Sequence, residues 1–348
     1  MFFASDNGSP VPPQVMAALG RANEGYAPSY GADAIMDAVR ARIRAIFEAP
    51  EAAVYLVATG TTANALSIAT FCPPWGAVYC QPEAHIAVDE CGAPEFYTAG
   101  AKLVHVDGPD GKIDPAALAA KLGNATPVGV HNVQPALLSL TNLTEAGTAY
   151  SVTEIAALAG IARQAGLPVH LDGARFANAL VATNASPSEM TWRAGVDVLS
   201  FGGTKNGLMG VEAVVIFDPA KAWEFELRRK RAGHLFSKHR YLSAQMQAYL
   251  DDDLWLELAR RANAAGQRLA AGLRALPEAK LSFEPPANLM FASLPRGIHT
   301  RVRAEGAAYY IFSGTEDGPE DDLQEARFVT SWCTTDEEID RFLSLLRG

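Results

Sequence analysis

The first two thirds of the chain alternate short apolar runs, rich in β-branched residues, with stretches of helical period. Continuous apolar runs of this length are typical of strands that are covered on both faces. We interpret the following runs as strands: 54–57, 77–79, 103–106, 128–130, 169–171, 196–199 and 214–217. Helices are expected between several of them, including 34–47, 63–70 and 154–165, the last opened by a capping box of Ser151 and Glu154. The alternation predicts an α/β fold with a mostly parallel seven-stranded sheet.

The pattern changes near residue 243. A long helical stretch is expected over 244–276, with four leucines on roughly one side, and we expect it to bridge two domains. Strands at 288–292 and 327–330 and a final helix capped by Thr335 and Glu338 follow it. We therefore predict a large domain over 1–245, which includes an N-terminal arm, and a small C-terminal α+β domain over 246–348.

Composition narrows the partners of the chain. Its 348 residues carry 29 basic and 39 acidic side chains, for a formal charge of −10, which argues against nucleic acid or an anionic membrane surface. The N-terminus lacks the basic segment of a secretory signal, and no apolar run is long enough to span a bilayer. The four cysteines have no C-x-x-C spacing, so reduced thiols are expected and no metal site. We expect a cytoplasmic protein that acts on a small molecule.

Two chemically distinctive residues follow apolar runs, 33 positions apart. Asp172 ends the run 168–171, and Lys205 lies in the glycine-rich loop 202–207. An enzyme that uses pyridoxal phosphate (PLP) needs a carboxylate to keep the pyridine nitrogen protonated and a lysine to hold the aldehyde as a Schiff base. Taken singly, the aspartate has the alternative of a turn residue and the lysine that of a solvated loop residue. Together they predict a PLP site.

A phosphate site is the next requirement. Gly60, Thr61 and Thr62 lie where a predicted strand gives way to a predicted helix, and a helix N-terminus with small hydroxyl residues binds phosphate. The same residues also serve as ordinary helix caps, so this signal gains weight only beside the aspartate and the lysine. Neither G-x-G-x-x-G after the first strand nor G-x-x-x-x-G-K-[ST] occurs, which argues against dinucleotide and nucleoside triphosphate cofactors.

His85 follows the second predicted strand and opens a predicted helix, so it is a further candidate for the PLP site. Its imidazole would stack on the pyridine ring, and it could also accept a proton from a bound substrate. The structural alternative is an ordinary surface or core imidazole.

With these residues the chain resembles the L-threonine aldolases, which are PLP enzymes of the aspartate aminotransferase-like fold (fold type I). The stretches that carry the resemblance span nearly the whole chain in the order of that family: 5–7, 30–33, 60–64, 84–85 with Glu90, 170–175, the lysine loop and 327–329. The specific part is His-Leu-Asp-Gly-Ala-Arg at 170–175 and its distance to the lysine. The G-T-x-A-N pattern at 60–64 is shared with other β-eliminating lyases.

The resemblance implies a role for each matching residue. It implies Lys205 as the Schiff-base lysine, Asp172 on the ring nitrogen, His85 on the ring face, and the glycine and threonines at 60–62 around the phosphate. It also implies that Ser5, Arg175 and Arg327 hold the substrate carboxylate, which two guanidinium groups can bind bidentately. Surface ion pairing is the alternative for the arginines.

The resemblance further implies that two subunits share each active site, in a homodimer or a homotetramer. Tyr30 would then bind substrate, and the basic stretches 228–231 and 238–240 would lie near the cofactor phosphate, from a neighbouring subunit. A solvated basic face is the alternative for these stretches.

One departure concerns the base. The best-known branch of the family has a second active-site histidine after an E-N-T motif, whereas the corresponding stretch 140–145 contains none. His131, Thr144, Glu145 or a bound water could take the proton of the substrate hydroxyl, and the sequence does not rank them.

The resemblance implies retro-aldol cleavage of L-threonine, L-allo-threonine and related β-hydroxy-α-amino acids such as phenylserine, giving glycine and an aldehyde. The nearest alternative is another fold type I reaction: β-elimination, racemisation or transamination. A non-catalytic binding protein that kept the fold is a more distant one.

Overall fold

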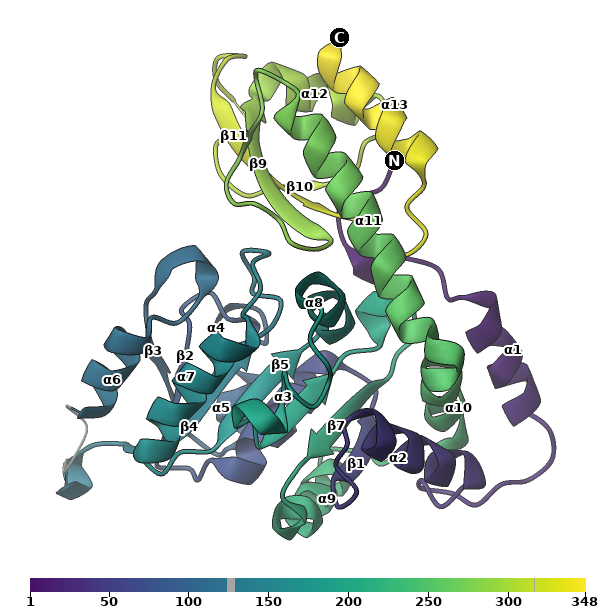
Figure 1. The fold of residues 1–348 in the computed structure, drawn as a ribbon, viewed down its shortest axis with the longest axis vertical. Helices are drawn as coiled ribbons and strands as arrows, with labels where there is room; N and C mark the ends of the chain where they lie inside the picture. The colour runs from purple at the N-terminus through teal and green to yellow at the C-terminus, as the bar shows by residue number, and fades with distance from the viewer. Residues whose placement is uncertain (124–128, 316) are drawn as a thin grey trace.

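The computed structural model describes residues 1–348 except 124–128 and 316. A large part built on one sheet lies below a smaller part with its own sheet, and helix α11 (Leu254–Arg274) runs from one to the other (Figure 1). The helices of the large part are α1 (Pro13–Ala22), α2 (Ala34–Ile46), α3 (Gly60–Phe71), α4 (His85–Val88), α5 (Ala93–Tyr97), α6 (Pro115–Gly123), α7 (Val152–Gln164), α8 (Phe176–Thr183), α9 (Ala222–Arg231) and α10 (Arg240–Leu250).

The large sheet confirms the predicted mostly parallel seven-stranded arrangement. Its strands are β1 (Ala53–Val57), β2 (Gly76–Cys80), β3 (Lys102–His105), β4 (Gln134–Thr141), β5 (Val169–Gly173), β6 (Val198–Phe201) and β7 (Glu212–Ile216), in the order β1-β7-β6-β5-β4-β2-β3. Strand β7 runs antiparallel to both of its neighbours, and the other pairs are parallel. The ends of β5 and β6 therefore meet at one edge, where open α/β sheets bind their ligands.

The strand predicted at 128–130 is wrong. Residues Gly129–His131 form a short 3-10 turn, Val128 lies outside the described residues, and the actual strand is β4. The pairing of β4 with β2 shifts by one residue, because Ala77 faces Pro135 whereas Val78 faces Leu137. A bulge of this kind tolerates proline, which donates no ladder hydrogen bond. The proline at its start hid this strand from the sequence pattern.

The single helix predicted over 244–276 is also wrong, because α10 and α11 are separate helices. The short turn Asp251–Asp253 lies between them, and Asp252 and Asp253 have left-handed backbones, with φ of 52° and 54°. Aspartate tolerates this conformation better than most residues. Three carboxylates are also favourable before the N-terminus of α11 and unfavourable at the C-terminus of α10.

Helix α11 nevertheless has the expected bridging role. Its first turns contribute Trp255 and Leu258 to the core of the large part, and its later turns contribute Leu269 and Leu273 to the core of the small part. The division of the chain at 245/246 stays a prediction.

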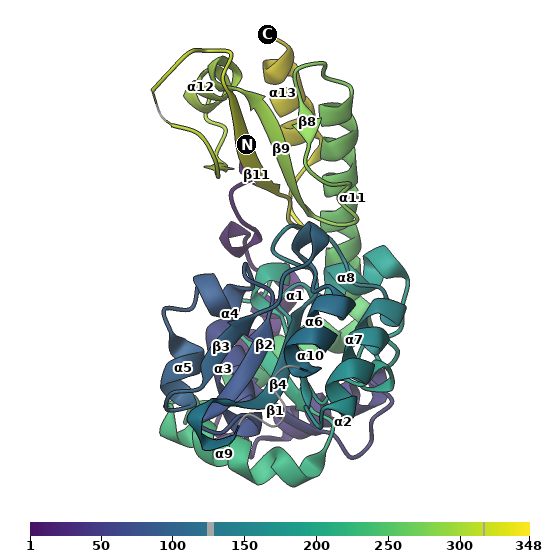
Figure 2. The same cartoon turned by 90° about the vertical axis from the view of Figure 1, so that its left-hand side faces the viewer.

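The small part is an antiparallel sheet covered by helices on one side (Figure 2). It contains β8 (Lys280–Leu281), β9 (Leu289–Pro295), α12 (Arg296–Ala304), β10 (Tyr310–Ile311), β11 (Leu323–Val329) and α13 (Asp336–Arg347), with strand order β10-β11-β9-β8. Strands β9 and β11 correspond to the two predicted strands. The predicted capping boxes at Ser151 and Thr335 are both present.

The N-terminus is built into this small part (Figure 1). The Phe3 N–H donates to Ala308 O at 2.8 Å, and Val329 N–H donates to Phe3 O at 2.9 Å. The Phe3 ring is fully buried, 5.0 Å from the Phe342 ring. The first residues therefore cross from the small part to the large one, beside the sheet edge at which β5 and β6 end. Within the described residues, no helix combines the length and apolar character needed to cross a membrane.

We predict that Phe3→Ala destabilises the small part by about 3–5 kcal/mol, because it leaves a cavity between Phe342 and the sheet. Phe2→Ala is the matched control, since that neighbouring ring is half exposed. Urea unfolding followed by circular dichroism measures both. An equal loss of stability in the two variants would contradict the packing described.

Candidate active site

Asp172 occupies the end of β5, where its carboxylate is buried. Its Oδ1 accepts from Ala174 N–H at 2.9 Å, and its Oδ2 accepts from Asn64 Nδ2 at 2.8 Å. Among the described residues, no cationic side chain forms an ion pair with it. A buried carboxylate with only neutral donors is costly without a positive partner. The donor set therefore fits a protonated ring nitrogen.

Lys205 is delivered by the loop after β6, in the short turn Thr204–Asn206. The loop passes directly over β5: Gly202 N–H donates to Gly173 O at 3.0 Å, and a Cβ on Gly202 would overlap the backbone of Ala174. Only glycine permits this approach. Across the described chain, Lys205 has no hydrogen-bond or ion-pair partner, so its amine is free to hold an aldehyde.

His85 begins α4, and its Nδ1 lies 2.8 Å from Oε1 of the buried Glu90. The same oxygen accepts from Asn64 Nδ2 at 2.8 Å. The hydrogen bond from Glu90 holds the pKa of His85 above its ordinary value, although burial and the charge of Lys205 oppose this. A continuous set of hydrogen bonds therefore links His85, Glu90, Asn64 and Asp172.

Sequence reasoning assigned no role to Asn64 or Glu90, although both lie in the matching stretches. The available signal was position. Asn64 is a polar residue one turn into α3, a helix whose neighbouring residues 62–70 are all buried. Glu90 follows His85 by five residues, and only the turn of the chain between them brings the two together.

The predicted phosphate segment forms the start of α3, three residues earlier than expected. Thr59 caps the helix, because its Oγ1 accepts from Thr62 N–H at 3.2 Å. The N–H groups of Gly60 and Thr61 have no acceptor within the part of the chain described, and a Cβ on Gly60 would meet nothing within 4 Å. Open space in front of free amides at the start of a 12-residue helix fits a phosphate.

The hydroxyl of Thr62 is already engaged inside the fold. Its Oγ1 lies 2.9 Å from His234 Nε2, a contact that the sequence did not reveal. Burial lowers the pKa of this histidine, which favours the neutral ring. The side chain of Thr62 therefore braces the helix start against the segment after α9.

Arg175, expected to hold a substrate carboxylate, is paired within the chain. Its Nε and Nη2 donate to Oδ2 and Oδ1 of Asp6 at 2.7 and 2.9 Å, and both side chains are buried. Burial opposes ionisation of Asp6, but the charges of Arg175 and Lys205 hold its pKa below the ordinary value. Ser5 Oγ accepts from Asn7 N–H at 3.2 Å. Only Nη1 of Arg175 remains without a partner among the described residues, so its substrate role stays a prediction.

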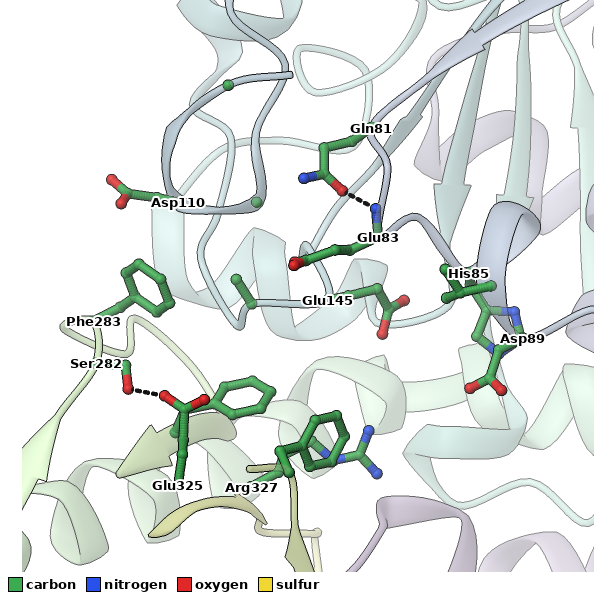
Figure 3. Close-up of a pocket in the computed structure, with 16 residues that line it drawn as sticks. Gln81, Glu83, His85, Asp89, Asp110, Glu145, Ser282, Phe283, Glu325 and Arg327 are labelled. Carbon is green, nitrogen blue, oxygen red and sulfur yellow. Dashed lines mark hydrogen bonds between the residues drawn. The ribbon is translucent and has the colours of Figure 1, made fainter. Parts of the chain in front are cut away.

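Arg327 is the freer guanidinium. It projects from β11 and lies over the rings of Tyr310 and Phe312, at 5.4 and 5.2 Å, and its Nη2 donates to Ala4 O at 3.3 Å. No carboxylate of the described chain pairs with it, and burial lowers its pKa. It lines a cavity of about 580 Å³ between the two parts. Figure 3 shows Arg327 and Glu145 entering this cavity from the small and the large part, with His85 at the right of the view.

The groups proposed to take the proton of the substrate hydroxyl, in place of the family's second histidine, differ in position. His131 is exposed before the start of the eight-residue strand β4, at the edge of the sheet opposite Asp172. It therefore cannot reach the same site within this chain. Thr144 is buried with its hydroxyl 2.8 Å from that of Thr148, whereas Glu145 lines the cavity.

Tyr30 lies against the segment that carries the basic stretches. Lys230 Nζ lies 4.7 Å from the centre of the Tyr30 ring, and Tyr30 N–H donates to Ser237 O at 3.2 Å. Arg229 is no solvated residue, since it is fully buried beneath the Tyr55 ring, and burial lowers its pKa to about 10. Among the described contacts of Tyr30, none involves Asp172 or Lys205, so its role in substrate binding stays a prediction.

Comparison with known proteins gives three findings. The family model described as Beta-eliminating lyase matches residues 3–293. A "Low specificity L-threonine aldolase" of Pseudomonas aeruginosa is 39% identical over 348 residues, which are 99% of this chain and 96% of that protein. A threonine aldolase of Leishmania major superimposes with a TM-score of 0.92 at 28% identity, covering 99% of this chain and 98% of that one.

A more distant structure shows the fold alone. The serine palmitoyltransferase of S. paucimobilis, described with bound PLP, has a TM-score of 0.72 at 17% identity and covers 100% of this chain and 86% of its own.

We predict that Asp6→Asn lowers the free energy of unfolding at pH 7 by about 3–5 kcal/mol, because it leaves the buried Arg175 charge unpaired. Since the folded pKa of Asp6 is depressed, its contribution is present above the unfolded value of about 3.9 and is lost as pH falls through the folded pKa. The difference between wild type and variant should therefore shrink below about pH 4.

Urea unfolding at several pH values measures this difference. Asp37→Asn is the control, since it removes an exposed partner of Arg40 and should cost less than about 1 kcal/mol. A pH-independent difference for Asp6→Asn would contradict the ionised pair.

Proposed function

Because the chain belongs to the β-eliminating lyase family, and within it to the L-threonine aldolases, we propose that it cleaves L-threonine and L-allo-threonine to glycine and acetaldehyde. Related β-hydroxy-α-amino acids such as phenylserine are further substrates of this proposal. The observation that carries it is the pairing, at neighbouring strand ends, of a buried carboxylate and a lysine amine. Among the described residues, the carboxylate has no cationic partner and the amine has no hydrogen-bond or ion-pair partner.

The described residues fit PLP at both of its ends. Lys205 would hold it through its amine, Asp172 would face its ring nitrogen, and the free amides of Gly60 and Thr61 would hold its phosphate. His85 would lie against its ring. When bound, PLP supplies a ring that withdraws electrons from the bond to be broken.

The side chains around the cavity account for substrate binding. Arg327 offers a guanidinium with no carboxylate partner among the described residues, and its Nη2 donates to Ala4 O in the N-terminal arm. Arg175 pairs with Asp6 of the same arm, so both guanidinium groups lie near Ser5. We propose that these groups fix the α-carboxylate, with Arg327 as the principal one. A fixed carboxylate orients the Cα–Cβ bond, since it removes rotation of the substrate about its own axis.

The residues that can take the β-hydroxyl proton also line the cavity. His85, Asp89 and Glu145 are titratable groups on its wall from the large part. Removal of this proton lets the hydroxyl oxygen form the carbonyl of the departing aldehyde. Closure of the cavity by the small part would exclude water during this step.

We also propose that the protein is a homodimer or homotetramer with shared active sites. Tyr30 and Phe236 expose apolar surface on the side that carries the basic stretches, and Met209 does so two residues after the lysine loop. A second subunit seated there would cover these side chains and bring its Tyr30 to the site.

Lys205→Ala should abolish the visible absorbance of the purified protein and its release of acetaldehyde from L-threonine, because no amine remains to hold the cofactor. A coupled alcohol dehydrogenase assay detects the aldehyde. Lys102→Ala, an exposed residue of β3, is the control and should change neither property. A coloured wild type that is inactive on threonine and phenylserine, yet racemises or transaminates amino acids, would redirect the assignment to another PLP reaction.

Shared sites predict complementation between two inactive variants. Lys205→Ala and Tyr30→Ala subunits, co-expressed with different tags and purified as heterodimers, should have one intact site of two, and hence about half the wild-type activity. Each homodimer alone should be inactive. Heterodimers without activity would show that Tyr30 acts within its own subunit, and an active Tyr30→Ala homodimer would show that Tyr30 has no role at the site.

A further inference from the structure

Glu90 is a buried ionisable residue that the mechanism above does not use. Its side chain has no solvent exposure, and its Oε1 accepts from both His85 Nδ1 and Asn64 Nδ2, each at 2.8 Å. Its Oε2 has no partner in the described chain. Burial of a carboxylate with one oxygen that accepts no hydrogen bond costs free energy. The hydrogen bonds at the other oxygen must offset this cost.

The backbone beside Glu90 carries a cost as well. Cys91 and Gly92, which follow it, both have left-handed backbones, with φ of 50° and 70°. The left-handed backbone of Cys91 is unfavourable, because this residue has a side chain. This turn directly follows Glu90, whose carboxylate lies beside Nδ1 of His85, five residues earlier.

The bond direction fixes the state of the imidazole. A carboxylate oxygen only accepts, so Nδ1 must carry the proton that it receives. The other nitrogen, Nε2, has no partner among the described residues, and His85 lines the cavity together with Arg327. The nitrogen available for proton exchange is therefore the one that can face the substrate.

We propose that Glu90 is a positioning residue for His85: it fixes the proton on Nδ1 so that Nε2 accepts the β-hydroxyl proton, while Asn64 holds this pair in register with Asp172. The inference rests on the proposed aldol cleavage. The proton passes from the hydroxyl oxygen to Nε2, and the O–H electron pair closes the aldehyde C=O. The electrons of the Cα–Cβ bond stay with Cα, which takes up a proton to give glycine.

Other charges around His85 act in both directions. Asp172 and Glu90 stabilise its charged form, and Lys205 destabilises it. On the cavity wall, Glu83, Asp89, Glu145 and Glu325 contribute negative charge and Arg327 positive charge. Among these groups only Glu90 forms a hydrogen bond to the ring, and this bond is the principal cause of the raised pKa of His85.

The experiment compares Glu90→Gln with Glu51→Gln in the holoenzyme. Both changes remove one carboxylate from the large part, but Glu51 is exposed and is not among the residues that line the cavity with His85. The first readout is the pH titration of the His85 imidazole by NMR with ¹³C-labelled histidine, assigned by the signal that His85→Asn removes. The second is kcat/KM for L-threonine as a function of pH.

Glu90→Gln should lower the pKa of His85, move the acid limb of kcat/KM to lower pH by the same shift, and reduce its maximum roughly 10- to 100-fold. Glu51→Gln should leave the titration and the maximum close to wild type. An unchanged His85 titration in Glu90→Gln, with activity reduced equally at all pH values, would overturn the proposal. If the protein cleaves no β-hydroxy amino acid, the NMR titration still decides whether Glu90 controls His85.

A second variant covers the case in which Glu90→Gln does not fold. Asn64→Leu removes a donor that competes for Glu90 Oε1, so the carboxylate should bind Nδ1–H more strongly and the pKa of His85 should rise. The two variants therefore shift the same titration in opposite directions. A fall or no change in Asn64→Leu would also overturn the proposal.

Discussion

The buried carboxylate of Asp172 is the constraint around which the site is arranged. Its two oxygens receive an amide from Asn64 and a backbone N–H from Ala174, which reduce the cost of burial and leave the charge uncompensated. These donors come from α3 and from the turn after β5, so two elements must keep a fixed distance. The packed helix and the parallel strands supply that rigidity, and the lysine loop closes on it through the glycine contact at 202.

A second buried charge joins the two parts of the molecule at the same place. The Asp6–Arg175 pair links the N-terminal arm to the end of β5. Asn288, the residue before β9, donates from its Nδ2 to Asp6 Oδ2 at 3.2 Å, the oxygen that also accepts from Arg175 Nε. The arm itself continues into the sheet of the small part. Any movement of the small part is thus transmitted to Arg175 and to the cavity that Arg327 lines from the other side.

The sequence sufficed for those features that depend on local pattern or on sheet geometry. Asp172 and Lys205 could be placed together because the ends of parallel strands share an edge, and both capping boxes follow from residues three positions apart. Strand β4 was missed because Pro135 sits at a bulge, and the break before α11 was missed because the leucine period continues across it. Pattern reports the average environment of a segment, and these features depend on single backbone conformations.

The site residues divide in the same way. The sequence assigned no role to Asp6 or His234, because their partners lie 169 and 172 positions away. Glu90 was quoted only as part of a stretch, since nothing local shows that a turn through Cys91 returns it to His85. Long-range pairs of this kind follow from packing, which the chain encodes only as a whole.

The buried carboxylates of the site differ in how their charge is neutralised. Four buried carboxylates gather near the lysine: Asp6, Glu90, Asp172 and Glu212. The first is paired with Arg175 and the second with His85. Glu212 accepts from Gly203 N–H at 2.7 Å beneath the lysine loop, and burial raises its pKa to about 7, so near neutral pH it is protonated for part of the time. Each of these three has a cation or a proton to offset its burial.

Asp172 has no cationic partner among the described residues, and it is also the carboxylate at the strand end closest in register to the lysine loop. A site that neutralises three carboxylates internally and leaves the fourth to a ligand selects for a ligand with a positive group at that point. A protonated pyridine nitrogen meets this demand, whereas a neutral sugar does not. The balance of buried charge therefore favours PLP independently of the sequence motifs.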